Sequence, residues 1–92
     1  MAEVTVRVPS SLRAKIGGAD ALAGRGDTVA QILRHAEAQA PDLSPLLRNE
    51  QGAFRAGLQV YVNDEHVRYR QGVQTRLQDG DTVLVVPTIM GG

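Results

Sequence analysis

Two stretches of the chain alternate hydrophobic and polar residues, and a third is a short hydrophobic run. The first stretch spans residues 4–8 and stops at Pro9, and the second spans residues 58–62. Side chains of a strand point alternately to the two faces of a sheet, so this alternation predicts strands with one buried face. The hydrophobic run at 81–86 predicts a last strand.

A segment between the first two stretches has the spacing of an amphipathic helix instead. Its hydrophobic residues fall on one helical face and are Val29, Ile32, Leu33, Ala36 and Ala40. Thr28 precedes Gln31 by the spacing of a capping box, and Asp27 places a negative charge at the helix start. Pro41 stops the helix, because the residue before a proline disfavours helical backbone angles. We therefore expect one helix between Thr28 and Pro41.

The remaining segments carry weaker signals. Residues 10–18 and 48–57 are predicted to be loops, the second of them flexible. Further expected elements are a weak strand at 19–23 with Leu22 inward, a helical turn at 43–47, a short strand at 67–69, a helical turn at 75–78 with Leu77 inward, and turns at 24–26, 63–65 and 79–81. This order predicts an α+β domain, with a mixed sheet and one main helix packed on one face.

Size and composition narrow the classes of function. A chain of 92 residues is one small domain, and its 42% hydrophobic content allows a core that must be mostly aliphatic. A formal net charge of zero argues against nucleic-acid binding. The N-terminus starts in a strand pattern without a signal peptide, and the hydrophobic runs are too short for a membrane span, so we expect a cytoplasmic protein.

The sequence ends in Gly91 and Gly92, which follow the last predicted strand and a short tail. Glycines leave a narrow backbone with an unhindered carboxylate, as an enzyme needs if it must activate the end of the chain. No cysteine is present, so any sulfur chemistry would take place at the C-terminus. We expect a domain at 1–86 and a flexible tail at 87–92, formed by Pro87, Thr88, Ile89, Met90 and the two glycines.

The C-terminal residues resemble a known family. The stretch from Leu77 to Val83, followed by Pro87 and the terminal Gly91-Gly92, resembles the pattern of ubiquitin-like sulfur carrier proteins of the MoaD/ThiS family. Residues 60–68 resemble more closely the CysO-like branch, whose members serve cysteine biosynthesis, and residues 26–29 also fit. The resemblance implies a β-grasp fold, in which the first and last strands lie side by side and parallel.

The resemblance also implies a mechanism. A ubiquitin-activating-like enzyme of the MoeB/ThiF type would use ATP to adenylate the carboxylate of Gly92. A sulfur donor would then displace AMP to give a thiocarboxylate, and a synthase would accept the sulfur. The chain itself would bind no cofactor and would be a carrier, not an enzyme. Cysteine synthesis is the first choice of pathway, followed by molybdopterin synthesis and then a sulfur-containing natural product.

Other functions remain open on the sequence, including a plain binding module whose terminal Gly-Gly is accidental. A protein modifier would use the same adenylation and then join Gly92 to lysines of target proteins. A permanent subunit would keep its tail inserted in a synthase. The sequence names neither the sulfur acceptor nor the oligomeric state.

Alternation predicts a docking surface on the sheet face away from the helix. If Val4, Val6, Val60, Val62, Val83 and Val85 face the helix, then Thr5, Arg7, Tyr61, Leu84 and Val86 line the other face. Exposed hydrophobic groups beside a functional tail form a candidate contact site, so we expect partner docking at Leu84, Val86, Tyr61 and Arg7. The alternatives are that both faces are covered or that this face forms a dimer.

The other polar residues suggest no catalytic or metal site. His35 and His66 are expected to be solvated surface residues, and no cluster with metal-ligand spacing accompanies them. Asp79 and Asp81 flank Gly80 and are expected to form a turn. The arginines at 7, 68, 70 and 76 form either a basic patch for acidic partners or a scattered solvated set.

Overall fold

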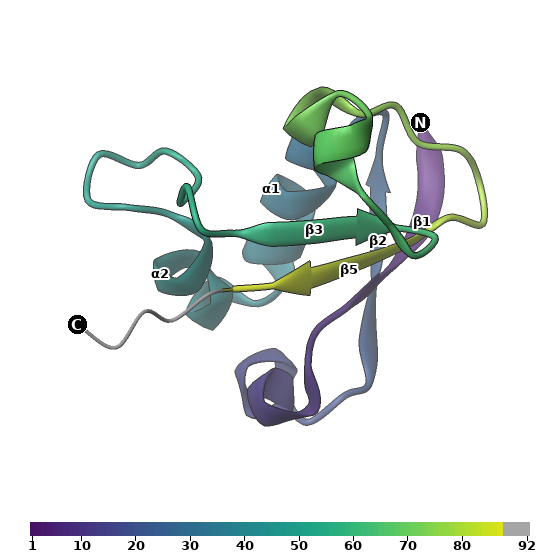
Figure 1. The fold of residues 1–92 in the computed structure, drawn as a ribbon. Helices are drawn as coiled ribbons and strands as arrows, with labels where there is room; N and C mark the ends of the chain where they lie inside the picture. The colour runs from purple at the N-terminus through teal and green to yellow at the C-terminus, as the bar shows by residue number, and fades with distance from the viewer. Residues whose placement is uncertain (88–92) are drawn as a thin grey trace.

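Within residues 1–87, which are the part of the chain that the structure describes, five strands form one mixed sheet (Figure 1). The structure is a computed structural model. The strands are β1 (Ala2–Arg7), β2 (Ala21–Gly26), β3 (Gln59–Val62), β4 (Glu65–His66) and β5 (Thr82–Val86). The helices are α1 (Val29–Gln39) and α2 (Ser44–Leu47), with the 3-10 turns η1 (Ser10–Ile16), η2 (Pro41–Leu43), η3 (Val67–Tyr69) and η4 (Gly72–Gln74).

The first and last strands are neighbours in the sheet. The strand order is β2-β1-β5-β3-β4, and β1 pairs with β5 in parallel, with Val6 opposite Val83. The other neighbouring pairs are antiparallel. The expected α+β class and β-grasp arrangement are therefore confirmed, with the C-terminal strand in the middle of the sheet.

The hydrophobic core lies between the sheet and α1. The alternating residues Val4, Val6, Val60, Val62, Val83 and Val85 are all buried, and so are Val29, Ile32, Leu33 and Ala36 of α1. This confirms the alternation that the sequence predicted. Burying aliphatic side chains contributes roughly 25 cal/mol per Å² of hydrophobic surface, so this layer is the main source of stability.

Polar contacts fix the start of α1. The side-chain oxygen of Thr28 accepts a hydrogen bond from the backbone N–H of Gln31 at 3.3 Å. The side chain of Gln31 in turn accepts one from the backbone N–H of Asp27 at 2.7 Å. Side-chain acceptors of this kind satisfy N–H groups that a helix start leaves without partners. The predicted helix is confirmed, and it ends two residues before Pro41.

The sequence expectation was wrong for several of the weaker elements. Residues 10–16 form η1 and not a loop, because Leu12 and Ile16 are anchored in the core. The second strand extends to Gly26, where a turn was expected, because it pairs with β1 along its whole length. Pairing and burial thus outweigh the poor strand propensity of its alanines and glycines.

The region after β3 also differs from expectation. The returning strand is only Glu65–His66, and residues 67–69, where the short strand was predicted to begin, form η3. The helical turn expected at 75–78 lies at Gly72–Gln74 instead. The buried Thr75 explains the shift, since its hydroxyl donates to the carbonyl of Gly72 at 2.6 Å and closes the earlier turn.

Candidate functional site

The sheet face opposite α1 brings the predicted docking residues together. Strand register places Leu84 of β5 beside Arg7 of β1 on one side and beside Tyr61 of β3 on the other. Val86 lies two residues further along β5, opposite Gln59. Arg7 is exposed, whereas Tyr61, Leu84 and Val86 are half-buried. The face is therefore accessible, and its use for docking stays a prediction.

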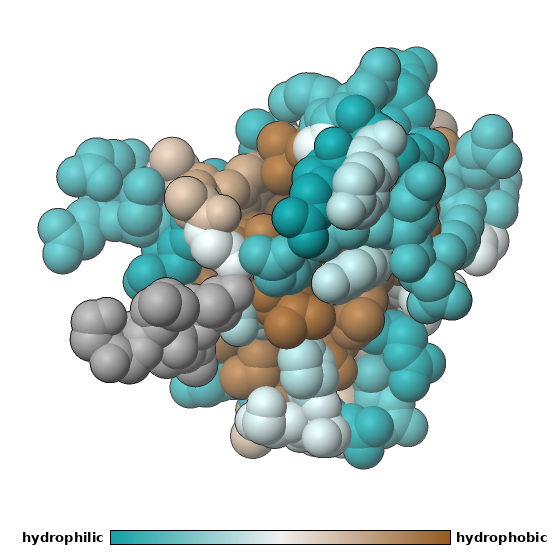
Figure 2. Space-filling model, in the orientation of Figure 1, coloured by the Kyte–Doolittle hydropathy of each residue, from teal (hydrophilic) through white to brown (hydrophobic). Residues whose placement is uncertain are grey.

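Hydrophobic surface is visible on this face of the molecule. Figure 2, in the orientation of Figure 1, shows hydrophobic atoms gathered around β5 and toward η1. Within residues 1–87, Arg7 forms no ion pair, so its charge is available at the edge of this surface. A hydrophobic patch with a charged border is a common form of protein contact site.

The C-terminal residues follow directly from this surface. Strand β5 ends at Val86, and Pro87 is half-buried. The predicted tail residues Thr88, Ile89, Met90, Gly91 and Gly92 lie outside the described residues. The boundary at residue 86 and the flexibility of the tail therefore stay predictions.

Turn residues at the other end of β5 fix the position of the strand. Asn63 and Asp64 both have left-handed backbone angles, with φ of 49° and 72°, as a tight two-residue hairpin turn requires. The side chain of Asn63 donates to Asp81 at 2.8 Å and accepts from the backbone N–H of Thr82 at 2.9 Å. Asp79 accepts from the backbone of Glu3 at 2.8 Å. The predicted turn role of Asp79 and Asp81 is confirmed.

Both histidines are half-buried and hydrogen-bonded, so the expectation of solvated surface residues was wrong. Nδ1 of His35 accepts from the backbone N–H of Arg25 at 3.3 Å. Nδ1 of His66 accepts from the backbone N–H of Arg68 at 3.0 Å, and the His66 ring packs edge-on against Tyr61 with centroids 4.9 Å apart. His66 thus caps η3 and packs against Tyr61 on the open sheet face.

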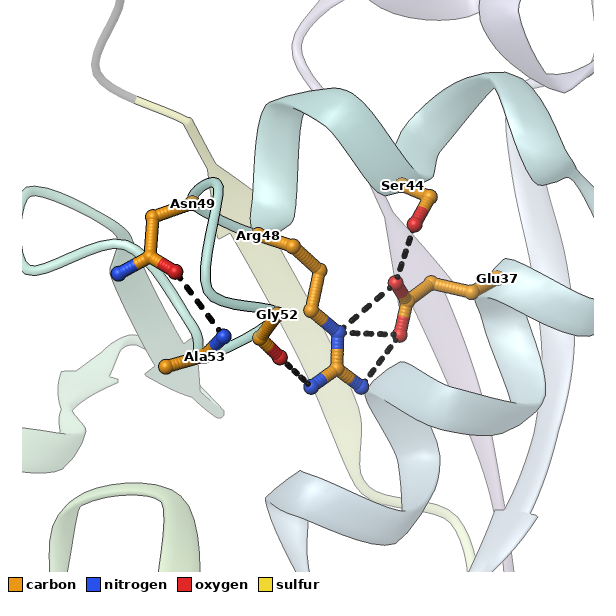
Figure 3. Close-up of polar contacts among 6 residues, drawn as sticks. All are labelled: Glu37, Ser44, Arg48, Asn49, Gly52 and Ala53. Atoms are coloured by element: carbon orange, nitrogen blue, oxygen red, sulfur yellow. Dashed lines mark hydrogen bonds and ion pairs between the residues drawn. The ribbon is translucent and has the colours of Figure 1, made fainter.

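One ion-pair network was not foreseen from the sequence. The Arg48 guanidinium donates to both carboxylate oxygens of Glu37, with the shortest contact at 2.8 Å, and the Ser44 hydroxyl donates at 3.0 Å (Figure 3). The two charged side chains are only 12% and 23% exposed. Eleven residues separate them, a spacing that belongs to no local motif, so only the fold reveals the pair.

The network shifts the ionisation of both groups. Burial alone would raise the pKa of Glu37, but hydrogen bonds from Arg48 and Ser44, together with the charges of Arg48 and Arg34, outweigh it and lower the pKa. The hydrogen bond to Glu37 raises the pKa of Arg48. Both groups are therefore charged near neutral pH.

Arg48 also holds the segment at 48–57 in place, although a flexible loop was predicted there. The guanidinium donates to the carbonyl of Gly52 at 3.0 Å and lies 4.0 Å from the centroid of the Phe54 ring. The side chain of Asn49 accepts from the backbone N–H groups of Gln51 and Ala53 at 2.9 and 3.0 Å. The segment is thus held by side chains at its base.

No three histidines or carboxylates of residues 1–87 come together in a way that would hold a metal ion. In the same part of the chain, no helix has the length and hydrophobicity needed to cross a membrane.

A parallel pairing of first and last strands, a helix across one face and an open face beside the last strand define a ubiquitin-like β-grasp protein. Residues 6–92 match the model of the ThiS family. A protein named sulfur carrier protein CysO from Mycobacterium tuberculosis is 35% identical over 91 residues, which are 97% of this chain and 98% of that protein. The chain therefore belongs to the ThiS family of ubiquitin-like sulfur carrier proteins.

Two other relatives extend this comparison. The solved Amycolatopsis orientalis BexX/CysO complex contains a chain that is 35% identical, with a TM-score of 0.81 over 97% of this chain and 99% of that one. A small archaeal modifier protein 3 from Haloferax volcanii is 37% identical over 65 residues, which are 71% of this chain and 70% of that protein.

Proposed function

We propose that this chain carries sulfur as a thiocarboxylate on Gly92 and delivers it to a biosynthetic enzyme, in the first instance for cysteine biosynthesis. The supporting observation is the β-grasp arrangement, in which β5 runs through the centre of the sheet and ends at Val86, six residues before Gly92. The match to the ThiS family extends to residue 92, and the similar proteins include carriers named CysO.

The chemistry follows from the carboxylate. An ionised carboxylate is a poor electrophile, and the α-carboxyl group has an ordinary pKa of about 3.5, so it is ionised near neutral pH. An activating enzyme of the MoeB/ThiF type, with ATP, would convert the Gly92 carboxylate to an acyl adenylate and release pyrophosphate. Sulfide would then displace AMP and give a thiocarboxylate directly, whereas a persulfide donor would give an acyl disulfide that a second thiol must cleave to release the thiocarboxylate. The resulting thiocarboxylate would pass its sulfur to the accepting synthase.

In this proposal the chain supplies a carrier tail and a docking surface, and the partners supply catalysis. The open sheet face presents Leu84, Val86, Tyr61 and Arg7 next to the strand that leads to the tail. A partner bound there would receive the tail without any rearrangement of the core.

Intact-protein mass spectrometry tests the proposal. The chain is incubated with ATP, an activating enzyme from the same source and a sulfide donor. We expect a mass gain equal to the replacement of one oxygen by sulfur, and we expect no gain when Gly92 is deleted. Absence of a gain, with each component active on another carrier, would contradict the proposal.

A second candidate function is protein modification, favoured by the similarity to a protein named small archaeal modifier protein 3. The same adenylate would then be attacked by a lysine amine of a target, giving an isopeptide bond and AMP. Incubation with cell extract distinguishes the two functions. Higher-mass conjugates that resist reducing agents and depend on Gly92 indicate a modifier, whereas the thiocarboxylate without conjugates indicates a carrier.

A further inference from the structure

A groove of about 330 Å³ lies between the segment 54–58 and the turns η3 and η4. Its deepest residues are Val60 and Val67, which are 1% and 6% exposed. Phe54 and Val73 are half-buried and line its two sides. Figure 2 shows hydrophobic atoms in this region, between the loop at the upper left of Figure 1 and the η3–η4 segment. The groove therefore has a hydrophobic floor.

Its border is positively charged. Arg55 and Arg68 line the groove and are exposed, and the residues that line it include no carboxylate. Neither arginine forms an ion pair within residues 1–87. The Arg55 side chain donates to the carbonyl of Pro45 at 3.1 Å, and the Arg68 guanidinium lies 5.4 Å from the Tyr69 ring centroid. Two guanidinium groups thus remain available to pair with anions.

One side of the groove is preformed by contacts within the protein. The backbone N–H of Arg55 donates to the carbonyl of Leu47 at 2.8 Å. Arg48, held by Glu37, stacks on the Phe54 ring. A shielded ion pair contributes little net free energy to stability, so stability alone does not explain why one is present at a surface loop. Here the ion pair holds Arg48 against Phe54, and the hydrogen bond to Leu47 holds the backbone of Arg55.

The opposite side is fixed as well. The buried hydroxyl of Thr75 accepts from the backbone of Gln71 at 3.1 Å and donates to Gly72 at 2.6 Å, which shapes η4. His66 accepts from the backbone of Arg68 and holds the start of η3. Binding to a preformed groove avoids much of the entropy cost of ordering a loop.

We propose that this groove binds a segment of a partner protein in which a hydrophobic side chain stands between carboxylates. The hydrophobic side chain would cover Val60 and Val67, and the carboxylates would pair with Arg55 and Arg68. Arginine pairs with carboxylates through two parallel hydrogen bonds, and the hydrophobic floor favours an acidic segment that also carries a hydrophobic side chain. The binding does not depend on adenylation of Gly92.

The groove is continuous with the docking face. His66 lines the groove and also packs against Tyr61 on the open sheet face. A partner protein that covers Tyr61 and Leu84 can therefore also contact the groove, as part of one continuous interface. The groove adds a second, charge-selective contact to the hydrophobic one.

Amide chemical shifts of the full chain test the proposal. The probe is a short capped peptide in which leucines alternate with aspartates, and the control is the same peptide with lysines in place of aspartates. We expect the acidic peptide to shift amides at residues 54–58, 66–68 and 72–73, and the basic peptide to leave them unchanged. Added salt should weaken the binding, because the rim charges are exposed.

Two variants and a matched control identify the contacts. Arg55→Gln and Arg68→Gln should each weaken binding of the acidic peptide about three- to fivefold, as expected for the loss of an exposed ion pair. Lys15→Gln removes a positive charge elsewhere on the surface and should leave binding unchanged. Neither arginine is buried, so all three variants should remain folded.

Three results would overturn the proposal. One is equal binding of the acidic and basic peptides, and another is unchanged binding in both arginine variants. The third is a single-stranded oligonucleotide that shifts the same amides at a lower concentration than the acidic peptide. Because no step uses the tail, a negative result here leaves the mass-spectrometric test of the carrier function unaffected.

Discussion

At the scale of single residues, the molecule depends on a few polar contacts that hold its surface segments in place. The Glu37–Arg48 pair connects α1 to the segment that follows α2, and Thr75 closes η4 from inside. Removing the hydrogen-bond partner of a buried polar group lowers the free energy of unfolding, because the group is left unsatisfied. These contacts explain why the segments that border the groove hold defined positions in a domain of this size.

Glu37→Gln should reduce the free energy of unfolding by about 2 kcal/mol near neutral pH, since it weakens a hydrogen-bonded, shielded charge pair. The pKa of Glu37 is lowered in the folded chain, so its contribution is present above its ordinary value of 4.5 and is lost as the pH falls through the folded pKa. Chemical denaturation across the acidic range measures this.

The control for this prediction is Glu50→Gln, because Glu50 is exposed and has no ion pair within residues 1–87. The stability difference between the natural chain and Glu37→Gln should narrow toward low pH, and the Glu50 variant should follow the natural chain. A difference that stays constant with pH would show that Glu37 does not act through its charge.

Leu84→Asp should leave the domain folded and reduce formation of the thiocarboxylate, because Leu84 lies on the open sheet face and not in the core. Ala38→Asp adds the same charge to an exposed position on α1 and should have no effect on the reaction. Circular dichroism checks the fold, and intact mass checks the coupling. Unchanged coupling in folded Leu84→Asp would remove the docking role from this face.

At the scale of elements, the sequence predicted those with a strong period and misplaced those without one. The strands at 4–8 and 58–62 and the helix after Thr28 were predicted from patterns that each reflect a buried face. The structure contains all three elements for that reason. Residues 10–16 and 21–26 have no such period, and their structure comes from contacts with distant residues. The ion pair of Glu37 with Arg48 and the groove likewise require the tertiary arrangement.

Thr28→Ala should lower the free energy of unfolding by about 1 kcal/mol, because it removes the acceptor for the N–H of Gln31 at the start of α1. Thr28→Ser keeps the hydroxyl and should retain most of the stability. Thermal or denaturant unfolding measures both variants. Equal losses in Ala and Ser variants would mean that the methyl group, and not the cap, provides the stabilisation.

At the scale of the whole molecule, the core and the reactive end are separate parts of the chain. The last buried side chain among residues 1–87 is Val85, and the proposed sulfur-carrying residue is Gly92. In the proposed function, the domain therefore provides a stable base, and the chemistry takes place at Gly92, beyond the last buried residue. This separation allows stability and transfer to be tested independently.

A chain shortened to end at Pro87 should unfold within about 2 °C of the full chain, because the described core is complete at Val85. The same chain should form no thiocarboxylate. Calorimetry and intact mass measure the two properties. A large loss of thermal stability would show that residues 88–92 contribute to the core, and would place the domain boundary beyond residue 86.

The central position of β5 has a consequence for how the protein is made. Until Thr82–Val86 has been synthesised, β1 and β3 have no strand between them, and the sheet cannot form its middle. The parallel contact joins residues that are far apart in the sequence, and such contacts form late and slowly. The domain can therefore complete its sheet only after β5 has left the ribosome, and a chain interrupted before β5 would lack both the middle of the sheet and the residues Leu84 and Val86 of the proposed docking surface.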